Sequence, residues 1–268
     1  MPNFKGCLAF NRYVTANSNS GFSAKPIYSS EHCLTFAGMP LIHVIIPAYN
    51  EEKSINQVIA AIPRDLVTEI IVVNNNSTDH TGLVAQRAGA TVLFAPEAGY
   101  GNACLTGIKY CVAKHLSERP HIIVFIDGDF SDYPEEMPLL VQPILANQAD
   151  LVIGSRALGQ REKGAMLPQQ IFGNWLATTL LHLFYQAKFT DLGPFRAIRT
   201  ETLVQLNMQD RTYGWTVEMQ LKAAKQKVRY TEVPVRYRKR IGFSKISGTL
   251  KGTVLAGYKI ITTIFRYL

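Results

Sequence analysis

LIHVIIPAYNEE, residues 41–52, begins as a continuous apolar run and ends in a polar turn. A second continuous apolar run, EIIVVN, occupies residues 69–74. A strand with one face in water alternates apolar and polar residues, whereas a continuous apolar run is typical of a strand that is covered on both faces. Both runs are therefore predicted to be interior strands of a sheet that has helices on its two sides.

The same pattern continues downstream. Three further strands are predicted at TVLFA (91–95), HIIVFI (121–126) and DLVIG (150–154). Helical stretches lie between the strands, near 53–62, 79–89, 101–116 and 135–147. Strands that alternate with helices form a mainly parallel sheet with right-handed crossovers. The predicted fold class is therefore α/β, with a mainly parallel central sheet and flanking helices in a single domain.

The two ends of the chain differ from this α/β region. Residues 1–38 contain the polar, aperiodic stretch TANSNSGFSAKPIYSSEH, so we expect a loose extension there, and Met39 is an alternative start. The domain itself is predicted at 39–247. Residues 248–268 are predicted to form a C-terminal amphipathic helix, on which Lys251, Lys259 and Arg266 share one stripe. Such a helix can lie in a membrane interface.

Length and composition are those of a globular protein: 268 residues, of which 47% are apolar and 18% charged. No run reaches the ~18 apolar residues of a membrane-spanning helix, and the N-terminus lacks the form of a signal peptide. None of the four cysteines has CxxC spacing, which is typical of reduced thiols in a cytoplasmic protein.

Positive charge is concentrated at the C-terminal end. The net charge of +8 divides into −2 for residues 1–224 and +10 for residues 225–268, where Glu232 is the only acidic residue. A basic tail on a near-neutral body indicates a phosphate-rich partner, which is a nucleotide, a nucleic acid or an anionic membrane.

A polar segment follows each of the five predicted strands. These segments are PAYNEE (47–52), NNNSTD (74–79), PEAGYGNA (96–103), DGDFSD (127–132) and GSR (154–156). Ligands of open α/β sheets bind outside the carboxyl ends of the strands, so the five segments are expected to converge on one site. The first strand is not followed by the G-x-G-x-x-G pattern of dinucleotide sites, which disfavours a Rossmann dehydrogenase.

Asp127 and Asp129 leave the fourth predicted strand with one residue between them. Side chains two residues apart on a strand point the same way, so the carboxylates project together if the extended geometry continues for two residues. A divalent cation would relieve their repulsion. Gly128 is expected to let the backbone approach a ligand closely. From the residues alone, an Asp-rich turn in which Asp129 or Asp132 caps the next helix remains an alternative.

The order of the motifs resembles that of family 2 glycosyltransferases with the GT-A fold. The branch that it resembles most contains the dolichyl-phosphate mannose and glucose synthases and their prokaryotic relatives. The resemblance runs from about Leu41 to the C-terminus and depends on IIPAYNEE, IDGDFSD, GSR, TDLGPFRAIR and RKRIGFSK. It implies a GT-A fold with a Rossmann-like nucleotide-binding half. It also implies inverting, metal-dependent transfer of glucose or mannose from a UDP- or GDP-sugar to polyprenyl or dolichyl phosphate.

On the donor side, the resemblance implies a nucleotide-sugar pocket and a cation site. The donor-binding candidates are Pro47, Tyr49, Glu51, Asn75, Asp127, Arg156 and Ser244. The ligands implied for Mg²⁺ or Mn²⁺ are Asp127 and Asp129. Asn74 and Asn75 stand where the family usually has two aspartates, which leaves the nucleobase open between UDP and GDP.

On the acceptor side, the catalytic candidates are Asp191, Arg196, Arg240 and Lys245. In relatives that act on hydroxyl groups, an acid at Asp191 serves as general base. A phosphate is already a nucleophile at neutral pH, so with that acceptor Asp191 is expected to orient rather than deprotonate. Arg196 is expected to hold a phosphate, with a salt bridge inside the fold as the alternative. Arg240 and Lys245 are expected to stabilise the departing diphosphate.

Other functions remain open from the sequence. A small soluble hydroxyl acceptor is one alternative, and a sugar nucleotidyltransferase is another, although the Gly/Lys-rich loop usual in that class is missing after the first strand. Nucleic acid is disfavoured as a partner because an acidic rim repels a polyanion. Glu218 is a further site candidate beside the acceptor segment. Phe172 and Trp175 are expected at a membrane interface, on the cytoplasmic face.

Overall fold

The computed structural model describes residues 39–242 and 250–268, which belong to one compact unit, Gly38–Leu268. The expected extension at 1–38 lies outside the described residues, as do Ser244 and Lys245. The boundaries 1–38, 39–247 and 248–268 therefore stay predictions.

A seven-stranded sheet forms the centre of this unit, in the order β3-β2-β1-β4-β6-β5-β7. The strands are β1 (Ile42–Ala48), β2 (Glu69–Asn74), β3 (Thr91–Phe94), β4 (Ile122–Phe125), β5 (Leu151–Ser155), β6 (Arg196–Arg199) and β7 (Tyr230–Pro234). Only β6 runs antiparallel to its neighbours, β4 and β5. The predicted α/β class with a mainly parallel sheet is confirmed, and the five predicted strands correspond to β1–β5.

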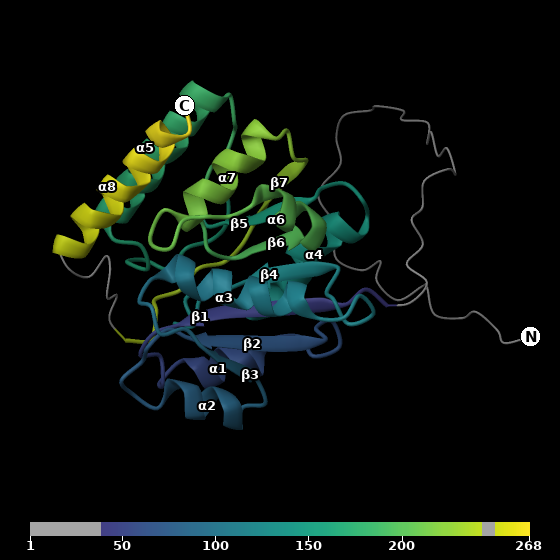
Figure 1. The fold of residues 1–268 in the computed structure, drawn as a ribbon. Helices are drawn as coiled ribbons and strands as arrows, with labels where there is room; N and C mark the ends of the chain where they lie inside the picture. Colours follow the sequence, from purple (N-terminus) through teal and green to yellow (C-terminus); the bar gives the residue numbers. More distant parts are fainter. Residues whose placement is uncertain (1–38, 243–249) are drawn as a thin grey trace, which may run out of the picture. The chain divides into compact units, whose positions relative to one another are not determined.

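The helices cover the two faces of the sheet (Figure 1). They are α1 (Ile55–Ala61), α2 (Thr81–Arg87), α3 (Tyr100–Ala113), the 3₁₀ turn η1 (Pro134–Glu136), α4 (Met137–Leu145), α5 (Pro168–Tyr185), α6 (Thr200–Leu206), α7 (Trp215–Lys225) and α8 (Leu250–Arg266). Residues of α1, α2 and α4 belong to one apolar cluster, whereas residues of α3, α5, α6, α7 and α8 belong to the other.

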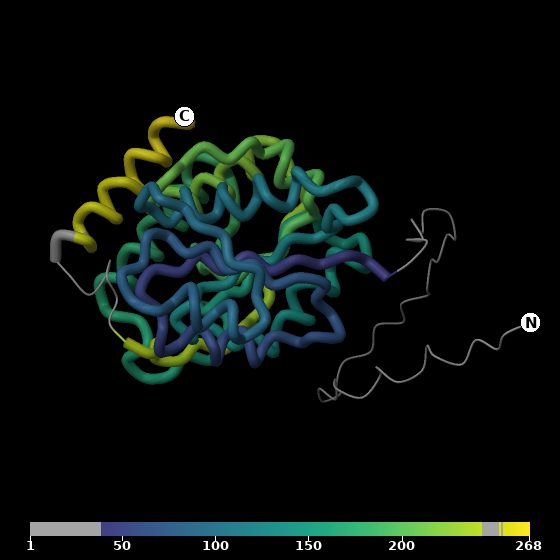
Figure 2. Tube along the Cα trace, turned by 60° about the horizontal axis from the view of Figure 1, so that its bottom comes forward, coloured from purple at the N-terminus to yellow at the C-terminus, as the bar shows by residue number. Residues whose placement is uncertain are grey.

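The burial of strand β1 explains its continuous apolar sequence. All seven of its residues are buried, and alternate side chains enter the two clusters, with Val44 in one and Ile45 in the other. Figure 2 shows β1, in purple, in the interior of the unit with other segments on either side. A continuous apolar run is thus required because each face of the strand is covered.

Helices α5 and α8 lie side by side (Figure 1). The hydroxyl of Tyr185 donates to the carbonyl oxygen of Ile264 at 2.6 Å, and the ring of Phe184 packs on that of Phe265 with centroids 5.5 Å apart. Within the predicted segment 248–268, the described residues Leu250–Arg266 form helix α8. Among the described residues, none of the helices is both long and apolar enough to cross a membrane.

Candidate active site

The carboxyl ends of β1–β5 open into one cavity of about 560 Å³. Each of the five polar segments contributes to its wall, as their positions at one edge of a parallel sheet predict. The cavity is lined by the expected residues Pro47, Tyr49, Glu51, Asn75, Asp127, Asp129, Arg156 and Arg240. Helix α5 adds Gly173 and Asn174 to the wall, and α8 adds Ala256, Gly257 and Ile260.

The loop after β4 holds the two carboxylates in place. Asp127 Oδ1 accepts a hydrogen bond from the Tyr100 hydroxyl at 3.0 Å. Asp129 Oδ1 accepts from the backbone N–H of Ser131 at 2.9 Å and from its hydroxyl at 2.6 Å. The chain turns at Phe130, whose φ of 62° lies in the left-handed region. Asp129 is therefore held for binding within the cavity.

One expectation for this loop needs correction, and one stays a prediction. A Cβ at Gly128 would meet protein atoms only at 3.5 Å or more, and the expected approach of a ligand to Gly128 stays a prediction. Neither Asp129 nor Asp132 caps the turn that follows, because η1 begins at Pro134 without a side-chain cap. The alternative of a purely capping role is thus not supported.

Burial disfavours the charged form of two carboxyl groups in this loop. Burial, followed by the repulsion of Asp129, raises the pKa of Asp127 to about 7. Burial also raises the pKa of Asp132 well above its usual value, with Asp127 contributing. Both carboxylate oxygens of Asp132 are buried without a hydrogen-bond partner among the described residues. A bound cation would stabilise the charged forms.

The residues present fit a divalent cation that the substrate helps to hold. Across 39–242 and 250–268, three or more His, Cys, Asp or Glu side chains nowhere converge as a metal site. Mg²⁺ and similar ions keep several waters and bind through one or two carboxylates together with substrate phosphates. Asp127 and Asp129 supply such a pair, and a diphosphate would have to complete the coordination.

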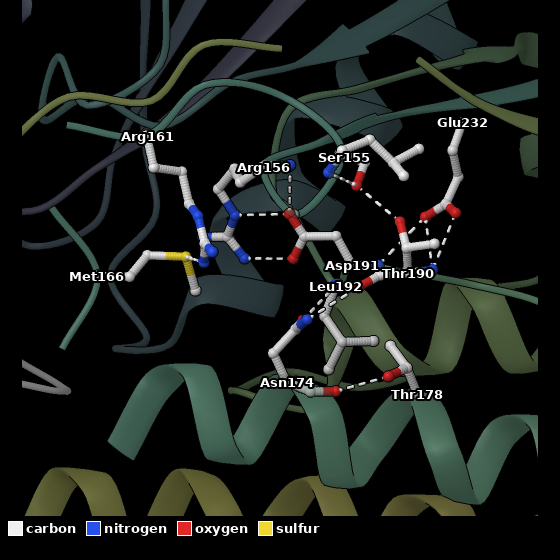
Figure 3. A network of polar contacts seen from close by, with 12 residues as sticks. Ser155, Arg156, Arg161, Met166, Asn174, Thr178, Thr190, Asp191, Leu192 and Glu232 are labelled. Carbon is white, nitrogen blue, oxygen red and sulfur yellow. Dashed lines mark hydrogen bonds and ion pairs between the residues drawn. The ribbon is translucent and has the colours of Figure 1, made fainter. Parts of the chain in front are cut away.

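Arg156, which lines the cavity, forms a buried ion pair with Asp191 (Figure 3). Asp191 Oδ2 accepts from the backbone N–H of Arg156 at 2.7 Å and from its Nε at 2.8 Å, while Oδ1 accepts from a terminal guanidinium nitrogen at 2.7 Å. The same guanidinium lies 5.1 Å from the ring centroid of Tyr237. Asp191 therefore orients Arg156, and its carboxylate is engaged on both oxygens.

Residues that the sequence did not single out hold the Asp191 segment. Glu232 of β7 accepts from the backbone N–H groups of Thr190 and Asp191, and Asn174 of α5 bonds to Thr190 and Leu192 (Figure 3). Gln220 donates to the carbonyl of Asp191 at 2.8 Å. Glu232 had one signal in the sequence, as the only acidic residue in the basic tail.

Arg196 does not take the expected place. Its side chain is completely buried, it is not part of the cavity wall, and its guanidinium donates to the backbone carbonyls of Leu192, Gly193 and Thr216. Burial lowers the pKa of Arg196 to about 10. This geometry does not support a phosphate contact or the alternative salt bridge; instead, Arg196 closes the turn that carries Asp191.

Glu218 is also structural in this arrangement. It is completely buried, and it accepts from the backbone N–H groups of Gln209 and Asp210, from Lys222 and from the Tyr267 hydroxyl. Its carboxylate thus joins α7 to the loop before it and to the end of α8. The expectation that Glu218 belongs to the acceptor site is not supported.

Asn75 holds the loop before α3 through that loop's backbone groups. Its amide nitrogen donates to the carbonyls of Ala95 and Glu97, at 3.2 and 2.7 Å, and its oxygen accepts from Gly99 N–H at 2.8 Å. Both amide donors are therefore used to fold the loop before α3. Asn75 lines the cavity, but this arrangement leaves only an acceptor position for a base.

Fold and site together define the class of this protein as a glycosyltransferase of the GT-A type. The family model for glycosyl transferase family 2 matches residues 43–206. The chain belongs to this family.

Similar proteins support the assignment. An uncharacterized glycosyltransferase of Mycobacterium tuberculosis is 36% identical over 217 residues, which cover 80% of this chain and 94% of the relative. The undecaprenyl-phosphate mannosyltransferase of Micrococcus luteus is 29% identical over 221 residues, covering 78% of this chain and 88% of that protein. Glucosyl-3-phosphoglycerate synthase from M. tuberculosis, solved with Mn²⁺, UDP and glucosyl-3-phosphoglycerate, has a TM-score of 0.66 at 23% identity, covering 85% of this chain and 80% of the other. At that identity the last similarity shows the fold alone.

Proposed function

We propose that this family 2 glycosyltransferase moves a hexose from a UDP- or GDP-sugar to the phosphate of a polyprenyl phosphate, with inversion and with Mg²⁺ or Mn²⁺. One observation carries the choice of acceptor: the carboxylate expected as general base, Asp191, is tied to Arg156 by three hydrogen bonds. A hydroxyl acceptor needs a free base, whereas a phosphate is already ionised.

On the donor side, the β1 segment and the loop before α3 enclose the nucleotide. Tyr49 offers an apolar ring, and Glu51, held by the Ser54 hydroxyl at 3.0 Å, offers a carboxylate to the ribose. Asp127 and Asp129 hold the cation. When bound, that cation supplies electrostatic stabilisation of the diphosphate.

On the acceptor side, Arg156 holds the acceptor phosphate and aims it at the anomeric carbon. Its bond to Asp191 fixes the direction of the guanidinium before the substrate arrives. The phosphate oxygen attacks in line, the bond to the nucleoside diphosphate breaks, and the departing charge develops next to Arg240. A single displacement of this kind inverts the anomeric carbon.

The part of the cavity wall formed by α5 and α8 leaves room for a lipid chain. Gly173 of α5 and Gly257 of α8 both line it, and a Cβ at either position would meet no atom within 4 Å. Ala256 and Ile260 add small or apolar surface on α8. An isoprenoid chain attached to a phosphate at Arg156 can pass along this space.

We further propose that the protein works on the cytoplasmic face of a membrane. Large apolar side chains on α5 and α8 are exposed, including Phe172 (60%), Trp175 (58%), Val254 (61%) and Tyr258 (68%). Apolar helix faces with aromatic residues bind at the boundary of headgroups and acyl chains. The expected basic stripe is reduced, because Lys259 pairs with Asp210 at 2.9 Å and is partly buried. Contact of apolar side chains with the lipid is therefore expected to contribute most to membrane binding.

The test is a transfer assay with radiolabelled UDP-glucose, UDP-mannose, GDP-glucose and GDP-mannose, Mn²⁺ or Mg²⁺, and polyprenyl phosphate. We expect one donor to give a chloroform-soluble, acid-labile lipid product in the wild type and none with Asp129→Asn. Transfer only to small hydroxyl compounds would contradict the lipid acceptor. Formation of a sugar nucleotide from sugar phosphate and nucleoside triphosphate would point to a nucleotidyltransferase.

A further inference from the structure

The segment that follows β7 lies directly against residues 127–132, the loop that carries Asp127 and Asp129 and is called here the carboxylate loop. The backbone N–H of Arg238 donates to the carbonyl of Ser131 at 2.9 Å, and that of Ile241 donates to the carbonyl of Asp129 at 3.0 Å. Tyr237 also forms an antiparallel bridge with Asp132. These backbone contacts place the side chain of Arg240 at the mouth of the cation site.

Arg240 pairs with one of the two carboxylates proposed to hold the cation. A terminal nitrogen of its guanidinium lies 2.7 Å from Asp129 Oδ2, and the two side chains are 28% and 5% exposed. The other oxygen of Asp129 is already bonded to Ser131.

We propose that Arg240 takes the place of the divalent cation on Asp129 until the donor binds. The side chain of Arg240 then leaves Asp129 and pairs with the donor's diphosphate. A divalent ion at Asp129 and a guanidinium on the same oxygen repel each other strongly in a partly buried site. The ion therefore binds well only when Arg240 has another anion to bind. Because Arg240 lines the same cavity as the carboxylates, a diphosphate placed there is within its reach.

This exchange couples the cation to the nucleotide. A cation that binds alone has to break the Arg240–Asp129 pair. When cation and nucleoside diphosphate bind together, a pair between Arg240 and the diphosphate replaces it. Coupling of this kind is reciprocal, so the nucleotide raises the affinity for the cation by the same factor as the cation raises that for the nucleotide. The inference rests on the proposed donor site and adds an order of events to it.

The experiment measures Mn²⁺ binding to the full chain without nucleotide, by calorimetry and by the loss of the free Mn²⁺ electron paramagnetic resonance signal. We expect Arg240→Ala and Arg240→Gln to bind Mn²⁺ roughly tenfold more tightly than the wild type, within the usual range of coupling factors. Both variants should also bind UDP or GDP with Mn²⁺ less tightly than the wild type does. In the double variant Asp129→Asn/Arg240→Ala the gain in Mn²⁺ affinity should vanish.

Arg236→Ala is the matched control. Arg236 lies on the same segment, and its replacement removes the same charge, but it pairs with Glu136 and Glu135 and not with Asp129. An Mn²⁺ affinity of Arg240→Ala that equals that of Arg236→Ala, or falls below that of the wild type, would overturn the exchange. A wild type that binds neither UDP nor GDP with Mn²⁺ would instead refute the proposed donor site, which separates the two failures.

Discussion

Replacing Asp191 by asparagine removes one negative charge from the buried pair with Arg156. The pair has hydrogen bonds of 2.7, 2.8 and 2.7 Å, and its side chains are 11% and 1% exposed. Removing one partner of such a pair costs about 3–5 kcal/mol, because the other charge stays buried without compensation. Asparagine keeps one oxygen acceptor, so we expect the lower end, about 3 kcal/mol. For a chain of this size, that loss lowers Tm by about 6–12 °C.

The assay is urea unfolding followed by circular dichroism, with Asp150→Asn as the matched control. Asp150 pairs with Arg199 and Arg229 just before β5, where its side chain is 19% exposed. Pairs near the surface contribute about 1 kcal/mol or less. Equal losses in the two variants would refute the conclusion that Asp191 is the buried counter-charge of Arg156.

Turnover of the same variant tests the role of Asp191 in catalysis. Since a phosphate acceptor needs no base, transfer to polyprenyl phosphate should fall much less in Asp191→Asn than in Asp129→Asn, with the larger change in KM for the acceptor. A folded Asp191→Asn protein with intact donor binding and no activity would favour a hydroxyl acceptor and true general-base catalysis.

Four further outcomes are expected. Asp129→Asn should abolish Mn²⁺-dependent binding of UDP or GDP in calorimetry; unchanged affinity would exclude Asp129 as a ligand. Burial lowers the pKa of His43 from 6.5 to about 4, so between these pH values the unfolded chain binds more protons and stability is lost as pH falls. In urea unfolding, the free energy of unfolding of His43→Asn should change less with pH over this range than that of the wild type. An equal change would assign the pH dependence to other groups. Gly257→Leu should raise KM for long-chain polyprenyl phosphate while nucleotide affinity stays the same; equal KM values would place the chain elsewhere. Phe172→Ser with Trp175→Ser should reduce flotation with liposomes, and flotation as in the wild type would remove α5 from the membrane contact.

Several features of this protein follow from local sequence alone. The continuous apolar runs at β1 and β2 predict buried strands, because side-chain alternation along a strand is independent of the rest of the fold. The convergence of the polar segments follows from parallel strand order, since all carboxyl ends then lie at one edge. Asp127 and Asp129 follow β4 directly, as the sequence predicts, but Gly128 and Asp129 lie in a turn, so strand alternation does not set the direction of their side chains.

Tertiary structure decided which charged groups meet. Asp191 pairs with Arg156, 35 residues away, which changes a candidate base into a positioning residue. Arg196 lies a few residues beyond Asp191, yet it is buried against backbone carbonyls, while Arg240 reaches Asp129 from the far end of the chain. Strand β6 runs antiparallel inside a sheet that the strand–helix alternation predicts to be mainly parallel. The physical reason is that the spacing of residues along a strand or helix fixes the direction of a side chain, whereas the partner of its charge depends on how distant elements pack.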